Sequence, residues 1–120
     1  MSKIYTLAVA NTLIVPVSFK VADGAKTTDF SFTLTMARQS DEEWNTGVCD
    51  EKGNAEHKKI KKHLREIASG WKDQKFVMDE NGAPAEFCPE AFDVMLASVG
   101  VADVILTSYM KENSAKVKNS

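Results

Sequence analysis

The stretch "LIVPVSFKVADGAKTTDFSFTLTM", residues 13–36, decides the fold of this chain. Apolar side chains occupy every second position on both sides of Asp23-Gly24, which is a turn signal. Alternation of this length is typical of half-buried strands. We therefore predict an antiparallel β-hairpin over about residues 13–37, with one packed face and one wet face. Pro16 cannot donate a ladder hydrogen bond, so the first strand is expected at an edge or to contain a bulge.

The residues before this hairpin continue the same alternation. Tyr5, Leu7 and Val9 are apolar and are separated by smaller or polar residues, which predicts a further strand. A single lysine followed by apolar residues loosely resembles a signal peptide. Because Asn11 and Thr12 interrupt the apolar run, we do not expect a cleaved signal.

After the hairpin the period becomes helical. Ser40 and Glu43 form a capping-box pattern, which predicts a short helix over about residues 41–46. A second helix is predicted over about residues 54–69, with Asn54 as its cap and Gly70 as its end. Its expected buried stripe consists of Ile60, Leu64, Ile67, Ala68 and Trp71.

The stretch from Trp71 to Phe92 predicts a compact corner. "DENG" is a turn signal between two short apolar patches, which indicates a tiny hairpin or tight turn. Proline suits the first position of a helix, so Pro89 predicts a helix over about residues 89–99, with Val99 on its buried side. We expect Trp71 and Phe87 to clamp the turn. The structural corner comprises Trp71, Gly82, Pro84, Phe87 and Pro89.

Gly100 separates this helix from a last one, predicted over about residues 101–112, and the polar end at 113–120 is expected to fray. Strands come first and helices follow, so we predict one α+β domain, residues 1–120: a hairpin or small sheet with three to four helices. Its 43% apolar and 27% charged residues are ordinary for a globular domain. The sequence contains no run of about 18 apolar residues, so it predicts no membrane-spanning helix.

The titratable residues do not form a catalytic or metal-binding pattern. His57 and His63 lie six positions apart on one helix, and neither Cys49 nor Cys88 is near them in sequence. Cys88 at a helix start is the best feature for an enzyme, because thiol pKa values can fall there, but a small capping residue is the plainer interpretation. We predict no catalytic residue, no cofactor and no metal, and therefore not an enzyme.

A basic helix leaves nucleic-acid binding as an alternative. Residues 56–75 contain seven Lys or Arg and three acidic residues. Aromatic residues are not interleaved with the basic ones, and the whole chain has a net charge of −2. A solvated helix face is therefore the preferred interpretation.

The last helix is more apolar than a one-sided surface helix requires. Two interpretations remain open: the helix packs across the sheet and the long helix of its own chain, or it presents a face to a partner or to a second copy. The hypothetical partner-binding residues are Val101, Val104, Ile105, Tyr109 and Met110.

Several segments together resemble the small tail-assembly chaperones of long-tailed bacteriophages. They are "MARQSDEE" at the end of a threonine-rich strand, then a helix, then "GWKDQKFVMDENGAPAEFCPEAFDVML", then a short apolar helix ending in "SYMKE". The resemblance extends from about Val15 to Lys111. Each segment alone is weakly specific, and the resemblance rests on the order in which the segments follow one another. The residues that match the family pattern are Trp71, Val77, Asp79, Gly82, Pro84, Phe87 and Glu90. The spacing from Trp71 to the turn and the cysteine at position 88 depart from that pattern.

The resemblance implies a non-catalytic protein in the host bacterial cytoplasm. Such a chaperone binds the long tape-measure protein and helps tail-tube subunits assemble around it. It is absent from the finished virion, and a longer frameshifted form is common. The first alternative is a structural tail component, such as a tube or completion protein, that stays in the virion. A nucleic-acid-binding regulator is the second alternative, and a homo-oligomer is possible in each case.

Overall fold

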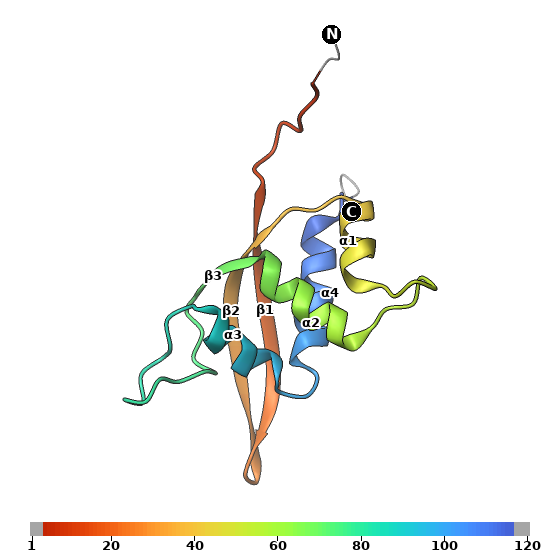
Figure 1. The fold of residues 1–120 in the computed structure, drawn as a ribbon. Helices are drawn as coiled ribbons and strands as arrows, with labels where there is room; N and C mark the ends of the chain where they lie inside the picture. The colour runs from red at the N-terminus through yellow and green to blue at the C-terminus, as the bar shows by residue number, and fades with distance from the viewer. Residues whose placement is uncertain (1–3, 117–120) are drawn as a thin grey trace.

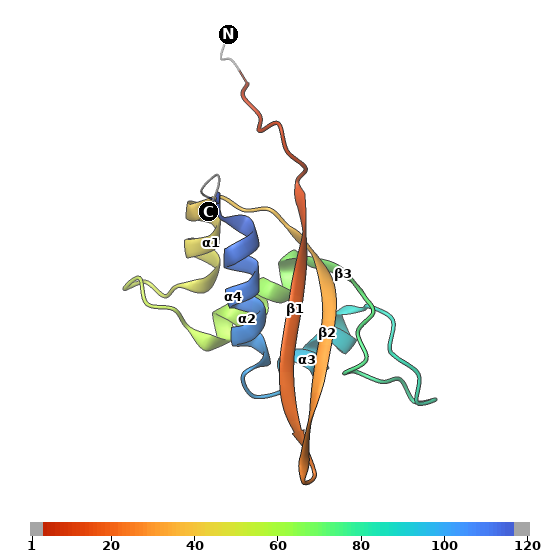
Figure 2. The same ribbon diagram turned by 180° about the vertical axis from the view of Figure 1, so that it is seen from behind.

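A computed structural model describes residues 4–116 of the chain. It contains strands β1 (Thr12–Asp23), β2 (Lys26–Ala37) and β3 (Ala68–Lys72) and helices α1 (Asp41–Val48), α2 (His57–Ile67), α3 (Pro89–Leu96) and α4 (Val101–Asn113). The strands form one antiparallel sheet in the order β1-β2-β3. The α+β prediction is therefore confirmed. The helices gather on one side of the hairpin, and the opposite side of the strands faces the viewer in Figure 2.

The hairpin forms as its alternation predicts. β1 pairs with β2 from Thr12↔Ala37 to Asp23↔Lys26, around a two-residue turn in which Gly24 has φ 66°. A positive φ at the first central position suits glycine in such a turn. Pro16 lies on the edge strand β1, as its missing N–H requires. The buried face of the hairpin supplies Val15, Val17, Phe32, Leu34 and Met36 to the core.

The described residues before β1 do not form the predicted strand. Residues 4–11 have no regular secondary structure, and Tyr5 and Leu7 are 83% and 75% exposed. Alternation alone is insufficient, because a strand also needs a neighbour with which to form a ladder. The last pairing contacts are at Asn11 and Ala10, whose carbonyl oxygens accept hydrogen bonds from the backbone and side chain of Arg38. Beyond that point the chain extends from the body as an arm (Figure 1).

Helix α1 begins as predicted. The Ser40 hydroxyl accepts a hydrogen bond from the Glu43 N–H at 3.2 Å, and the Glu43 carboxylate accepts one from the Ser40 N–H at 3.0 Å. This capping box satisfies two N–H groups that the helix itself cannot pair. The helix continues to Val48, two residues beyond the predicted end, and buries Trp44.

Helix α2 is shorter than predicted at both ends. It begins at His57, and Asn54 is not its cap, because residues 50–54 form a loop closed by the Asp50 carboxylate. It ends at Ile67 and leads directly into β3. Ala68 and Trp71 therefore belong to a strand and not to the helix. The open edge of β2 accepts these residues through a bulge at Thr35/Met36, and this tertiary pairing overrides their helical spacing.

Helices α3 and α4 meet at a sharp turn. α3 begins at Pro89 as predicted but ends at Leu96, and Gly100 at φ 85° precedes α4. Val99 lies in this turn and is fully exposed, so its predicted place on the buried side of a helix is wrong. α4 ends at Asn113, one residue beyond the prediction. Of the tail expected to fray, Asn113 is the last residue of α4, residues 114–116 have no helix or strand, and residues 117–120 lie outside the described part of the chain.

Helix α4 closes the core over the hairpin. Ile105 and Tyr109 are completely buried, and the Tyr109 hydroxyl donates a hydrogen bond to the Ala37 carbonyl at 2.7 Å. Asn113 exchanges hydrogen bonds with the backbone of Gln39, at 2.9 and 3.4 Å. The last helix is thereby held against the end of β2, and its side chains Val101, Ala102, Ile105 and Tyr109 are buried within the chain.

Candidate functional site

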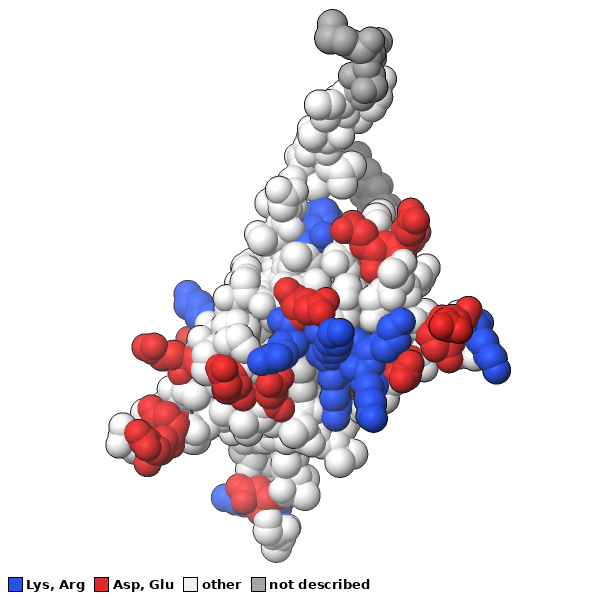
Figure 3. Space-filling view, viewed as in Figure 1, with Lys and Arg blue, Asp and Glu red and all other residues white. Residues whose placement is uncertain are grey.

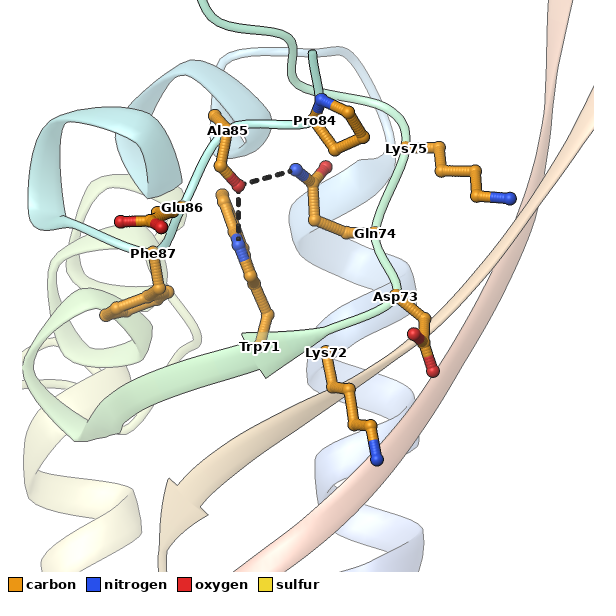
Figure 4. Close-up of a pocket in the computed structure, with 9 residues that line it drawn as sticks. All are labelled: Trp71, Lys72, Asp73, Gln74, Lys75, Pro84, Ala85, Glu86 and Phe87. Carbon is orange, nitrogen blue, oxygen red and sulfur yellow. Dashed lines mark hydrogen bonds between the residues drawn. The ribbon is translucent and has the colours of Figure 1, made fainter.

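The predicted corner exists and surrounds an open hollow. β3 ends at Lys72, and Asp73 then turns the chain with φ 66°, the only positive φ of a non-glycine residue among residues 4–116. The hollow has a volume of about 480 Å³ (Figure 4). It is lined by residues from both sides of the corner: Trp71, Lys72, Asp73, Gln74, Lys75, Pro84, Ala85, Glu86 and Phe87.

A small hairpin forms the far end of the corner, as "DENG" predicts. Met78 and Pro84 form an antiparallel bridge, and the Ala85 N–H donates to the Val77 carbonyl at 2.9 Å. The Asp79 carboxylate accepts hydrogen bonds from two turn N–H groups, those of Asn81 at 2.9 Å and of Ala83 at 3.0 Å. Gly82 has φ 79°, which a side chain rarely tolerates. The turn is therefore specified by its own residues.

Gln74 fixes the walls of the hollow. Its side chain is 3% exposed, and its oxygen accepts hydrogen bonds from the N–H groups of Phe76 and Val77 at 3.1 and 2.8 Å. Its nitrogen donates to the carbonyls of Val77 and Ala85 at 2.9 and 3.0 Å. One buried amide thus joins the two strands of the corner. The sequence does not point to Gln74, because an isolated glutamine gives no signal until the backbone groups around it are known.

An aromatic cluster supports the same walls. The Trp71 indole N–H donates a hydrogen bond to the Ala85 carbonyl at 3.0 Å. This oxygen therefore accepts hydrogen bonds from both Gln74 and Trp71 (Figure 4). The rings of Trp71 and Phe87 meet edge to face at 5.2 Å, and Phe92 of α3 lies behind both of them. The expected clamp between Trp71 and Phe87 is therefore present in the structure.

The start of α3 completes the corner. Pro89 occupies the first turn of the helix, and the Cys88 sulfur accepts a hydrogen bond from the Ala91 N–H at 3.4 Å. Cys88 thus has the geometry of a helix cap. The rim of the hollow carries balanced charge, with Lys72 and Lys75 opposite in sign to Asp73 and Glu86. A partly apolar wall can bind an apolar side chain of another protein, while the charged rim forms ion pairs with charged residues beside it.

The predicted partner face on α4 requires a correction. Val101, Ile105 and Tyr109 are 3%, 0% and 0% exposed, so they are packed within the core of their own chain. Only Val104, which is half-buried, and Met110, which is 49% exposed, are accessible to another molecule. The five residues do not form one surface, because a helix on a sheet turns only one side to solvent.

A second buried polar group lies at the contact between α1 and α2. His63 is 8% exposed, its ring packs edge to face on Trp44, and its Nε2 is hydrogen-bonded to the Gln39 side chain. Burial lowers the pKa of His63, and the nearby carboxylates of Glu66 and Glu43 raise it by a smaller amount. The backbone hydrogen bond from Ser40 is the main cause that lowers the pKa of Glu43. The sequence pattern placed His63 on a helix but not in the core.

Neither a metal site nor a straight membrane helix is found within the described range. Among residues 4–116, no three His, Cys, Asp or Glu side chains gather closely enough to hold a metal ion. Within the same range no single helix is long and apolar enough to span a membrane. α3 and α4 reach that length only as a pair that is bent by 107°. Comparisons of the sequence and the structure with family models, curated proteins and solved structures found no match.

Proposed function

We propose that this protein is a non-catalytic tail-assembly chaperone of a long-tailed bacteriophage, acting in the host bacterial cytoplasm. In this role it binds the tape-measure protein and assists assembly of the tail-tube subunits around it. The proposal is supported by the segments between Val15 and Lys111 that resemble this family. It is also supported by the position of the family-like residues Trp71, Pro84 and Phe87, which line one hollow.

The hollow at the corner is the observation that carries the proposal. Its apolar wall is built from Trp71, Pro84 and Phe87, and its shape is fixed before any partner arrives by the four hydrogen bonds of Gln74. A preformed site loses little side-chain entropy on binding. A long helical client presents apolar side chains flanked by charged ones, which suits an apolar wall with Lys72, Lys75 and Glu86 at its rim. Repeated copies on one long client would add avidity.

The experiment is co-expression of this protein with the long helical tail protein encoded in the same genome, followed by affinity purification. Lys72→Glu combined with Lys75→Glu makes the rim acidic, and both side chains are exposed, so folding is preserved. We expect this pair to reduce recovery of the client at least about tenfold, which corresponds to about 1.4 kcal/mol. The matched control is Lys58→Glu with Lys62→Glu on α2, which makes the same charge change away from the hollow. Equal recovery with both pairs would contradict a client site at the corner.

The alternative of a structural tail component is tested on purified virions. A chaperone leaves the assembled tail, so mass spectrometry of the particles should find the tube protein and not this chain. Stoichiometric amounts of this chain in the virion would replace the chaperone role with a structural one.

One observation favours a nucleic-acid-binding role as the second candidate. Basic side chains cluster over α2 in Figure 3, and among the described residues Lys58, Lys61 and Lys62 have no hydrogen-bond or ion-pair partner. Asp93 neutralises Arg65 at 3.1 Å, and acidic side chains surround the cluster. This candidate predicts salt-sensitive retention on DNA that is lost when Lys58, Lys59, Lys61 and Lys62 are replaced by glutamine. The chaperone proposal predicts no such retention.

A further inference from the structure

The arm that precedes β1, residues 4–11, exposes several apolar side chains that the fold does not use. Ile4, Tyr5, Leu7 and Val9 are 90%, 83%, 75% and 53% exposed. Both views in Figures 1 and 2 show the arm leaving the body in the direction of β1, away from the helices. Single exposed apolar residues are ordinary, but four within six positions are typical of a surface that another chain covers.

The arm has the pattern of a strand and lacks only a neighbour. Tyr5, Leu7 and Val9 continue the period of the core residues Val15 and Val17. Within its own chain the arm has no neighbour beyond Arg38, because β2 ends at Ala37 and the chain then leads into α1. A strand from another molecule can supply the missing ladder.

The free edge of β1 limits where such pairing can occur. In a two-residue hairpin the residues that flank the turn are a hydrogen-bonded pair, so the odd-numbered residues of β1 bond to β2. The even-numbered residues direct their backbone groups to the open edge. Pro16 and Lys20 are two of them, and both residue types protect an edge against added strands. The unprotected part of the edge is therefore Thr12 and Ile14, which continue directly into the arm.

The charges indicate the partner. No Asp, Glu, Lys or Arg lies between Ile4 and Phe19, so two copies of this segment can lie side by side without repulsion. An antiparallel pair of arms around a two-fold axis gives both copies the same contacts.

We propose that residues 4–14 of two copies of this chain pair as antiparallel strands and join the two sheets edge to edge. The arms thereby cover each other's apolar side chains, and Pro16 stops the pairing on each side. This interface is far in sequence from residues 71–87 and does not depend on client binding at the corner. A dimer would present two corners to one client.

Sedimentation equilibrium of the full chain tests the proposal. We expect a dimer for the unmodified protein. Leu7→Asp places a charge in each arm and should raise the dimer dissociation constant by tenfold or more. Val99→Asp is the matched control, since Val99 is fully exposed and lies far from the arm in sequence, and it should leave the mass unchanged. A monomeric unmodified protein, or a dimer that Leu7→Asp does not weaken, would overturn the proposal.

A cysteine scan then tests the antiparallel arrangement. Cys49→Ser and Cys88→Ser remove the two native thiols, and a single cysteine is placed in turn from Thr6→Cys to Ala10→Cys. Only the residue nearest the two-fold axis meets its own copy, so oxidation should give a sharp maximum of covalent dimer at one position. Formation of no covalent dimer in the series, or an equal yield at every position, would show that the arms do not pair in this way.

Discussion

The hydroxyl of Tyr109 donates a hydrogen bond of 2.7 Å to the carbonyl of Ala37, which joins the last helix to the end of the second strand across 72 positions of sequence. The Tyr109 side chain is completely buried, and its ring packs on Trp44 with centroids 4.8 Å apart. This contact explains why α4 is so apolar: it is a core helix that the N-terminal hairpin requires.

Tyr109→Phe is expected to lower the free energy of unfolding by about 1–2 kcal/mol, because the Ala37 carbonyl then loses its buried donor. Urea denaturation measures this change. Thr107→Ala on the exposed side of α4 is the control and should have a much smaller effect. Equal stabilities of Tyr109→Phe and the unmodified protein would show that water replaces the hydroxyl at no cost.

Gly47→Ala is expected to destabilise the protein by about 1–3 kcal/mol, because an added methyl group would lie 2.2 Å from the His63 ring. Gly70→Ala is the matched control, since no atom lies within 4 Å of its added carbon. Thermal unfolding of both variants measures the difference. If the two variants melt together, α1 and α2 are less tightly packed than this contact indicates.

Stability is expected to fall as the pH decreases below about 6.5, the ordinary pKa of histidine. Burial lowers the pKa of His63 in the folded protein, so the unfolded chain binds a proton first and gains stability relative to the folded one. The loss continues down to the lower folded pKa of His63. Glu43 acts in a separate, more acidic range, because its pKa is lowered below the usual 4.5.

Urea denaturation between pH 7 and pH 5 measures the contribution of His63. The slope of stability against pH should become smaller in His63→Gln, which keeps a polar side chain but does not titrate. Replacement of the exposed His57 by glutamine is the control and should leave the slope of stability against pH unchanged. An unchanged slope in His63→Gln would assign the pH dependence to other groups.

Gln74→Leu is expected to destabilise the corner by about 2–3 kcal/mol, because the N–H groups of Phe76 and Val77 lose their buried acceptor. The carbonyls of Val77 and Ala85 keep one donor each, the Ala85 N–H and the Trp71 indole. Hydrogen exchange should accelerate at the amides of Phe76, Val77 and Ala85 while the hairpin amides of β1 and β2 stay protected. Uniform acceleration throughout the chain would show that the corner is not a separate structural unit.

Trp71→Ala is expected to lower the free energy of unfolding by about 3 kcal/mol, because it removes a large ring and the hydrogen bond to Ala85. Trp71→Phe keeps the contact with Phe87 and should recover part of this loss. Near-unchanged melting of Trp71→Ala would contradict the clamp.

The sequence was informative where a local rule and the tertiary structure agree. Alternation predicted β1 and β2, the Ser40–Glu43 pair predicted the start of α1, and Pro89 predicted the start of α3. β3 was missed because Ala68 and Trp71 also fit a helical stripe, and only the open edge of β2 favours the strand. Alternation also predicts a strand in the apolar arm, because the pattern does not show that a neighbouring strand is missing there.

The candidate site was predictable only in part. Trp71, Pro84 and Phe87 were identified as a structural corner, and the structure adds that they line a hollow. Gln74 and His63 could not have been identified, because each is defined by partners far from it in sequence or by backbone groups around it. The α4 face was assigned incorrectly because an apolar helix has the same sequence pattern whether a partner or its own sheet covers it.

The central claim, that the corner binds a long helical client, is tested most directly by site-specific photo-crosslinking during co-expression with the tape-measure protein. A photoreactive residue at position 75 on the rim should form a covalent adduct with that protein. The same residue at position 58 on α2 should form none. Adducts at position 58 alone, or at neither position while the two proteins still co-purify, would contradict the claim.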